Sequence, residues 1–150
     1  MRRVVVTGLG TINPLGNNVN TSWENLIDSK SGISKITKFN VDTYPCKIAG
    51  SIEDSQINDE IVSLREQRKI DRFITLGLIA ANEAIVDSGF ISDEKSSVRS
   101  GVMVGSGIGG LDTIYKNSSV LDNQGIRKIS PFFIPSSLIN LLSGHISIKY

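Results

Sequence analysis

Two short valine-rich runs, each followed by glycines, most constrain how this chain can fold. Residues 3–7 form an apolar, β-branched run that ends at Gly8 and Gly10, and residues 98–104 are a second strand candidate that runs into Gly105. A short apolar run that enters a glycine turn is typical of a strand buried on both faces. With helical patterns between and after them, they predict an α/β protein with parallel strands covered by helices.

Helical patterns fill the sequence between the two runs. Residues 21–24 have the Ser/Thr-x-x-Glu spacing of a capping box and predict a short helix that stops near Gly32. The clearest helix is expected over residues 68–88, where apolar residues recur at helical spacing, with Gly89 as the residue that ends it.

Shorter helices are expected in the last third of the chain. Residues 111–121 are compatible with a helix after the second apolar run. Pro131 and Pro135 open two further short segments, because proline suits the first turn of a helix.

Composition excludes several classes of protein. The chain has 150 residues, 39% of them hydrophobic and 21% charged, which fits one soluble globular domain. With 16 basic and 15 acidic residues, no overall field gathers nucleic acid or an anionic membrane. One Cys and one His leave no disulfide framework and no zinc site of several Cys and His ligands. No apolar run is long enough to cross a membrane and no secretory leader is evident, so the expected location is cytoplasmic.

Gly105, Gly107 and Gly110 form a G-x-G-x-x-G pattern between an expected strand and an expected helix. Such a turn can bind a pyrophosphate through backbone N–H groups. A dinucleotide site also needs an acidic residue about 20 residues further on, where this chain has Ser130 and its neighbours. Close backbone packing is the plainer interpretation of the glycines, and nucleotide binding is the outside alternative.

The single Cys and the single His do not indicate a catalytic pair. Cys46 lies in irregular sequence, with no histidine nearby and no helix N-terminus following it to lower the pKa of a thiol. His145 lies in an apolar helical stretch, where a lone histidine is usually structural. We therefore expect no catalytic residue and no metal ligand among them.

Two basic groups stand out from the nearly neutral background. Arg65, Arg68 and Lys69 have the i, i+3, i+4 spacing of one helix face, and Arg127 and Lys128 form the second group. Each group alone is usually a solvated surface. If the fold brings them together, they form a basic patch for an acidic or phosphorylated partner.

Several motifs together resemble the N-terminal part of the β-ketoacyl-acyl carrier protein synthase II family, the elongating condensing enzymes of bacterial fatty acid synthesis. The resemblance extends from Arg2 to Tyr150. The matching segments, in order, are Arg2-Arg-Val-Val-Val-Thr-Gly-Leu-Gly10, Pro14-Leu-Gly16, Ser31-Gly-Ile33, Arg65-Glu-Gln-Arg-Lys69, Gly105-Ser-Gly-Ile-Gly-Gly110 and Arg127-Lys-Ile-Ser-Pro-Phe-Phe-Ile-Pro-Ser136.

The resemblance implies a thiolase-like fold of five α/β/α/β/α layers and a homodimer that needs no cofactor. In that family a cysteine takes the acyl group from acyl carrier protein, and two histidines assist decarboxylation of malonyl-acyl carrier protein and condensation. All three follow the region that residues 1–150 match, so this chain corresponds to an incomplete domain ending before the strand with the nucleophile. Cys46 and His145 match neither role. Without the nucleophile, the isolated chain is expected to be catalytically silent.

The resemblance also implies two binding surfaces. Arg65, Arg68, Lys69, Arg127 and Lys128 match the family's surface for the acidic acyl carrier protein. Ile108, Leu111, Ile114, Phe133 and Ser137 match positions around the acyl-chain pocket near the dimer interface, with Ile108 as its gate. Three accounts of the chain stay open: a truncated inactive product, half of a split condensing enzyme, or a module that binds acyl carrier protein.

Overall fold

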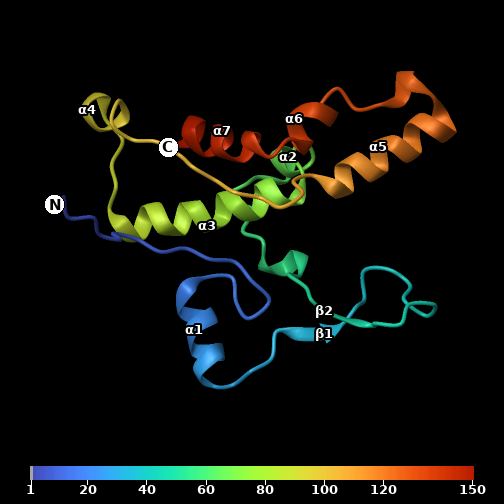
Figure 1. Cartoon of the computed structure of the whole chain (residues 1–150), viewed down its shortest axis with the longest axis horizontal. Helices are drawn as coiled ribbons and strands as arrows, with labels where there is room; N and C mark the ends of the chain where they lie inside the picture. The colour runs from blue at the N-terminus through green and yellow to red at the C-terminus, as the bar shows by residue number, and fades with distance from the viewer. Residues whose placement is uncertain (1) are drawn as a thin grey trace. The chain divides into compact units, whose positions relative to one another are not determined.

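A computed structural model describes residues 2–150 of the chain (Figure 1). The chain forms two compact units. Met1–Asn58 and Ile79–Gly89 make up the first, here called the N-terminal unit, and Asp59–Leu78 and Phe90–Tyr150 make up the C-terminal unit. Helix α3 (Arg72–Ser88) is continuous and contributes residues to both.

The N-terminal unit contains short elements joined by long connections. They are α1 (Val19–Ile27), β1 (Ile33–Lys35), β2 (Ile48–Gly50), the 3-10 turn η1 (Asp54–Gln56) and the second part of α3. Strands β1 and β2 pair antiparallel, with Ser34 opposite Ala49. Among residues 2–150 this two-stranded ribbon is the whole of the sheet structure.

Helix α1 begins earlier than its capping pattern predicted. Asn18 is the N-cap, and its side-chain oxygen accepts a hydrogen bond from the backbone N–H of Thr21 at 2.8 Å. The predicted box starting at Thr21 is therefore wrong, because asparagine is an equally good cap and lies one turn upstream. Ser22 is buried inside the helix, where its hydroxyl donates to the Asn18 carbonyl at 2.7 Å.

Residues 3–7 do not form the strand that their composition predicted. Val4 and Val6 are 91% and 79% exposed, and no neighbouring strand pairs with them. β-Branched residues favour an extended chain, but a ladder also needs a partner that local sequence does not supply.

The segment after this run is instead fixed against α3. The backbone N–H of Leu9 donates to the Asp87 carboxylate at 2.8 Å, and that of Thr11 donates to Glu83 at 2.9 Å. The backbone approaches the helix so closely that a Cβ on Gly10 would lie 2.0 Å from the Ala80 carbonyl oxygen. Glycine is therefore required at this contact.

The C-terminal unit is helical. It contains α2 (Leu64–Gln67), the start of α3, α4 (Glu94–Ser97), α5 (Leu111–Gln124), the 3-10 turn η2 (Ile126–Lys128), α6 (Phe133–Ser137) and α7 (Asn140–Lys149). Residues 98–104, the second predicted strand, form no ladder either, and Met103 is 99% exposed. The parallel sheet expected from the two apolar runs is thus not formed by the described residues.

The long helix expected over residues 68–88 is interrupted near its start. A capping box between Ser63 and Glu66 forms the separate helix α2, and α3 begins only at Arg72. The helix end was predicted correctly: Gly89 has φ +64°, the left-handed conformation that follows a helix C-terminus. The last segment also differs from expectation, because Pro135 lies inside α6 and α7 starts at Asn140.

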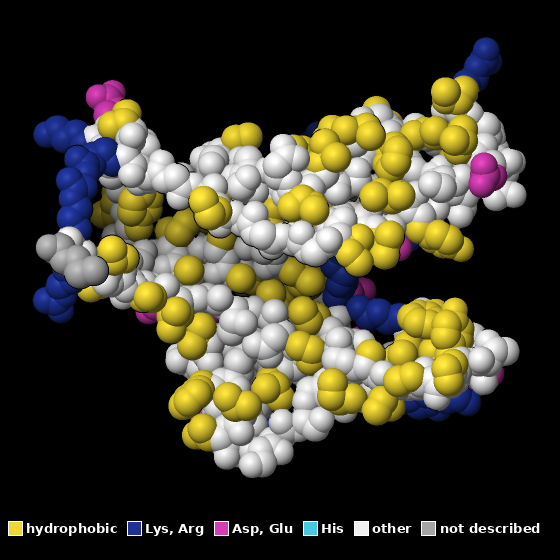
Figure 2. Space-filling view, viewed as in Figure 1, with side chains coloured by type: hydrophobic (Ala, Val, Ile, Leu, Met, Phe, Trp, Pro, Cys, Tyr) yellow, Lys and Arg dark blue, Asp and Glu magenta, His cyan; other side chains and the backbone are white. Residues whose placement is uncertain are grey.

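The core of the C-terminal unit lies between α3 and α7 (Figure 1). Its buried apolar side chains include Val62, Ile74, Leu78, Leu142 and Ile146. The two helices touch where Gly77 faces the Leu142 side chain. Many other apolar side chains stay exposed, as the hydrophobic colouring in Figure 2 shows.

Candidate functional site

The glycine turn before α5 packs against the end of α6. The N–H of Gly110 donates to the Ser137 carbonyl at 3.0 Å, and a Cβ on Gly110 would lie 2.6 Å from the Ser137 Cα. Gly109 has φ +74°, a conformation that side chains disfavour. These two glycines therefore serve close packing, which was the plainer of the two sequence interpretations.

Asp71 connects this turn to α3. Its carboxylate is buried, with 7% of the residue exposed. One oxygen accepts from the backbone N–H of Phe73 at 3.2 Å and the other from that of Thr113 at 3.0 Å. A single carboxylate thus caps the first turns of α3 and α5, where negative charge is favourable. Sequence patterns do not single out Asp71, because its second donor lies 42 residues further along the chain.

The same carboxylate argues against the dinucleotide alternative. A pyrophosphate at the N-terminus of α5 would need its free N–H groups. The N–H of Thr113 is already bonded to Asp71, and a phosphate there would face a buried negative charge.

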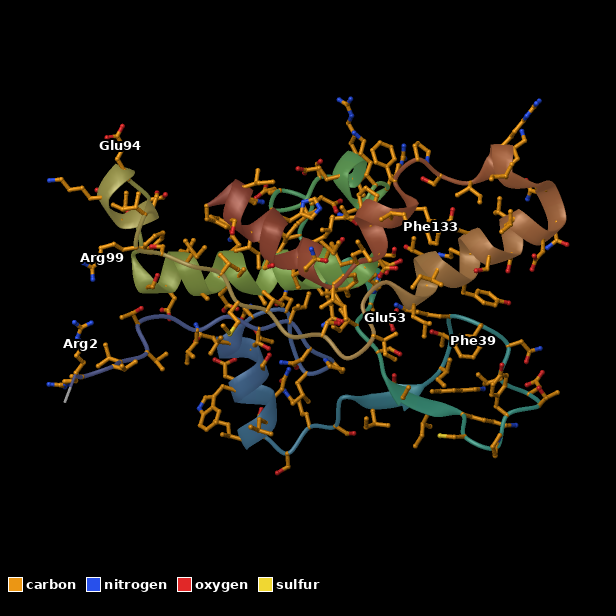
Figure 3. All side chains as sticks on the ribbon, turned by 45° about the horizontal axis from the view of Figure 1, so that its top comes forward. Arg2, Phe39, Glu53, Glu94, Arg99 and Phe133 are labelled. Carbon is orange, nitrogen blue, oxygen red and sulfur yellow. The ribbon has the colours of Figure 1, made fainter. Side chains whose placement is uncertain are left out.

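The five residues expected at the acyl-chain pocket all lie within four positions of Gly110 or Ser137, the two residues that the hydrogen bond described above joins. They are Ile108, Leu111, Ile114, Phe133 and Ser137. Ile108 and Leu111 are 64% and 54% exposed, whereas Ser137 is buried. Figure 3 marks Phe133, which is half-buried on α6 where that helix meets α5. The structure thus places an open apolar surface here, and its acyl-binding role stays a prediction.

The first basic group does not occupy one helix face, contrary to the sequence prediction. Arg65 lies in α2, Arg68 is the C-cap of that helix, and Lys69 lies beyond it. The predicted spacing required a continuous helix, but α2 ends at Gln67 and the next helix begins only at Arg72. All three basic side chains are nevertheless exposed.

Lys69 links this group to the second one. Its ammonium lies 5.3 Å from the centre of the Phe132 ring, a cation–π contact. Arg127 and Lys128 are exposed in η2. Lys128 and Phe132 are four positions apart, a stretch of chain that spans at most about 14 Å. The two basic groups therefore lie at the two ends of the short segment 129–131.

That segment is attached to α5. The N–H of Ser130 donates to the Asn117 side chain at 3.2 Å, and the Ser130 hydroxyl oxygen accepts from the N–H of Phe132 at 3.1 Å. The segment that joins the two basic groups is therefore held in place by hydrogen bonds.

Glu66 lies among the basic residues of α2 but is directed at its own helix. Its carboxylate accepts from the Ser63 hydroxyl at 2.7 Å and the Ser63 N–H at 3.0 Å. These hydrogen bonds hold the pKa of Glu66 below its ordinary value of 4.5. It therefore stays ionised at neutral pH while facing the helix N-terminus.

The cysteine and the histidine belong to different units. Cys46 is exposed in the β1–β2 connection, with its sulfur 3.4 Å from the Ile48 carbonyl oxygen. His145 is half-buried in α7. Within residues 2–150 no cluster of three or more His, Cys, Asp or Glu side chains is arranged for a metal ion. None of the helices described for this chain has both the length and the apolarity to cross a membrane.

Sequence comparisons identify similar proteins. A family profile described as "Beta-ketoacyl synthase, N-terminal domain" matches residues 1–150. The chain is 45% identical over 149 residues to 3-oxoacyl-[acyl-carrier-protein] synthase 2 of Coxiella burnetii, covering 99% of this chain and 36% of that protein. It is 39% identical over 147 residues to the protein of the same name from Staphylococcus aureus strain COL, covering 98% and 35% respectively. The chain spans little more than a third of these relatives.

Solved structures share the fold. A β-ketoacyl synthase from Burkholderia phymatum matches with a TM-score of 0.77 at 20% identity, over 99% of this chain and 36% of that one. A type II PKS acyl-carrier protein in complex with its ketosynthase provides a second match, with a TM-score of 0.73 at 26% identity, over 100% and 39%. The expected fold class, the N-terminal portion of a thiolase-like α/β fold, is confirmed by these ketosynthases.

Proposed function

Because this chain belongs to the β-ketoacyl synthase family through its N-terminal domain, we propose that it is the part of a 3-oxoacyl-acyl carrier protein synthase that docks the carrier protein. The observation that carries the proposal is the pair of exposed basic groups at the two ends of residues 129–131. The proposed partners are acyl- and malonyl-loaded acyl carrier protein in fatty acid elongation.

Charge supports this role. No ion pair of the described residues involves Arg65, Arg68, Lys69, Arg127 or Lys128. The basic side chains that line the surface are thus available to an acidic partner. Complementary charge of this kind accelerates association and makes affinity depend on salt. A solved ketosynthase of the same fold has been captured in complex with its acyl-carrier protein.

The test is a charge reversal. The double variant Arg68→Glu with Lys69→Glu is expected to weaken binding of holo-acyl carrier protein at least about tenfold at low salt. Binding is measured by titration calorimetry at two salt concentrations, and the variant is expected to lose most of the salt dependence of the parent chain.

A matched control reverses another adjacent pair. Arg2→Glu with Arg3→Glu changes the net charge equally, at exposed positions of the N-terminal unit. It is expected to leave affinity within about twofold, because neither arginine is among the residues proposed to bind the carrier protein. Equal losses in both double variants would show a nonspecific charge effect and contradict the proposal.

The second proposed surface is the apolar junction of α5 and α6. Ile108, Leu111 and Ile114 would line one wall of an acyl-chain pocket, with Phe133 and Ser137 behind it. Their support is that they gather around one backbone contact while the side chains nearest the turn stay exposed. The pocket would be completed by further protein, including the second subunit of a homodimer.

Bond-making is not proposed for this chain alone. Cys46 is exposed in the β1–β2 connection rather than placed at a helix N-terminus, and the sequence has one histidine where the family's chemistry uses two. The exposed apolar side chains within residues 3–7 and 98–104 favour a second account, a condensing enzyme completed by another polypeptide.

One assay tests both accounts. Incubated with acyl- and malonyl-loaded acyl carrier protein, the chain alone is expected to give no β-ketoacyl product by mass spectrometry. Co-refolded with the remaining part of the Coxiella relative, it is expected to give product. Turnover by the chain alone would refute the non-catalytic assignment, and a folded, inactive mixture would count against the split enzyme.

A further inference from the structure

We infer that Asp71 is a positioning residue that joins the basic residues following α2 to the glycine turn before α5. The roles of the two surfaces rest on the proposed function, while the joint itself stands on the geometry around one buried carboxylate. The consequence is that binding of the carrier protein at Lys69 changes the backbone hydrogen bonding of the glycine turn that contains Ile108.

The first side of the joint is the short chain between α2 and α3. The N–H of Lys69 donates to the Glu66 carbonyl at 2.8 Å, and the N–H of Ile74 donates to the Asp71 carbonyl at 3.0 Å. Lys69 is thus fixed at the end of one helix and Asp71 at the start of the next. Two residues apart, they are separated by at most about 7 Å of chain. Lys69 is exposed and Asp71 is buried, so the link runs from surface to interior.

The second side of the joint is the glycine turn. Beyond its hydrogen bond to the N–H of Thr113, the Asp71 carboxylate lies beside Gly110, where an added Cβ would be 3.2 Å from the same oxygen. Gly110 is itself bonded to Ser137 of α6. Ile108, the proposed gate, is two residues before Gly110 and exposed. Movement of Asp71 would therefore displace the glycine turn together with Ile108 and would disturb the Gly110–Ser137 hydrogen bond to α6.

A carboxylate suits this joint better than other capping groups. Serine, asparagine and aspartate cap a helix almost equally well, so the first turn of α3 alone would accept any of them. The two N–H donors, from Phe73 and Thr113, bond to different oxygens of Asp71, and among these three residues only aspartate has two side-chain acceptor oxygens. Exchanging Asp71 for serine or asparagine is therefore expected to keep the hydrogen bond that caps α3 and to remove the one to Thr113 of α5.

The experiment compares Asp71→Ser and Asp71→Asn with the control Asp112→Asn. Asp112 is also in the first turn of α5, but its side chain is 60% exposed and paired with Lys116. Amide hydrogen exchange by NMR is measured on the whole chain without a partner. In both Asp71 variants, exchange at Thr113 and Gly110 is expected to rise at least about tenfold, since charge-assisted bonds are the stronger ones. The control and amides in the middle of α3 are expected to change little.

The second readout is coupling on addition of holo-acyl carrier protein. In the parent chain, the amide resonances of both Lys69 and Thr113 are expected to shift. In Asp71→Ser the Lys69 shift is expected to persist and the Thr113 shift to disappear, a separation that a purely structural cap would not produce.

The outcomes distinguish the two levels of the hypothesis. Exchange that rises equally at all amides, an equal effect in Asp112→Asn, or a Thr113 shift that survives in Asp71→Ser would overturn the positioning role. If the parent chain binds no carrier protein, the proposed function fails and the coupling between Lys69 and the turn fails with it. In that case the exchange pattern still decides whether Asp71 joins the two segments.

Discussion

Both units contain a glycine-bearing segment whose backbone is bound by a carboxylate of α3 or its cap, yet the two attachments differ in burial. In the N-terminal unit Glu83 accepts the N–H of Thr11 in a partly buried position, and Asp87 accepts that of Leu9 in an exposed one. In the C-terminal unit Asp71 does so from a buried position. A hydrogen bond to a buried charge costs more to break than one that water can replace. The same device therefore fixes the glycine turn more firmly than the N-terminal segment.

Glycine replacement should have the largest effect, and it removes the close approach in both units. Gly10→Ala and Gly110→Ala are each expected to lower the free energy of unfolding by about 2–4 kcal/mol, because the new methyl meets backbone rather than a flexible side chain. Urea denaturation followed by circular dichroism measures the change.

The matched control is Gly107→Ala, in the same glycine turn. A Cβ there meets nothing within 4 Å, and φ of Gly107 is not positive. Its stability is expected to change by less than about 1 kcal/mol, and upward if anything. A loss as large as that of Gly110→Ala would show that the turn needs flexibility rather than close packing.

Removal of the α3 carboxylates that hold the N-terminal segment, Glu83 and Asp87, is expected to have an intermediate effect on stability. Glu83 accepts from both Thr11 and Val19, at 2.9 Å and 2.8 Å. Glu83→Ala is expected to lower the free energy of unfolding by about 2 kcal/mol, because two half-buried N–H donors lose their partner. Asp87→Ala is expected to cost under about 1 kcal/mol, since water can replace its exposed bond. Equal losses in thermal melts would mean that burial does not set the difference.

Acidification should have the smallest effect, because Glu66 caps its own helix and is exposed. Its folded-state pKa lies below 4.5, so its contribution is fully present above that pH and is lost as the pH falls through the folded pKa. On acidification, the unfolding midpoint of the parent chain should therefore fall slightly more than that of Ser63→Ala, which lacks the side-chain hydrogen bonds of the cap. An identical pH profile in both chains would assign the acid sensitivity to other groups.

Local patterns predicted what local interactions decide. The end of α3 at Gly89 and the helix after Gly110 were visible in the sequence, since each depends on residues within one or two turns. The packing role of the glycines was also expected, but their contacts, such as Gly110 with Ser137, are distant in the sequence. The family resemblance supplied the fold class, which the ketosynthase structures confirm.

Distant partners decided the rest. Residues 3–7 have strand composition but no strand to pair with. The helix predicted over residues 68–88 begins only at Arg72, where the Asp71 carboxylate accepts the N–H of Phe73. Asp71 was missed for the same reason, because its meaning appears only when Thr113 comes beside it. The roles of the basic and apolar surfaces stay predictions until binding is measured.

The attachment of the N-terminal segment to α3 also has a consequence for folding during translation. The N–H groups of Leu9 and Thr11 bond to acceptors that lie 78 and 72 residues further along the chain, so these bonds can form only after the acceptors are synthesised. At ordinary elongation rates those acceptors are synthesised roughly 4–15 s later. Until these hydrogen bonds form, the valines that precede Leu9 are not attached to α3. Their protection by a chaperone, or the speed of translation through α3, would then govern how much of the nascent chain escapes aggregation.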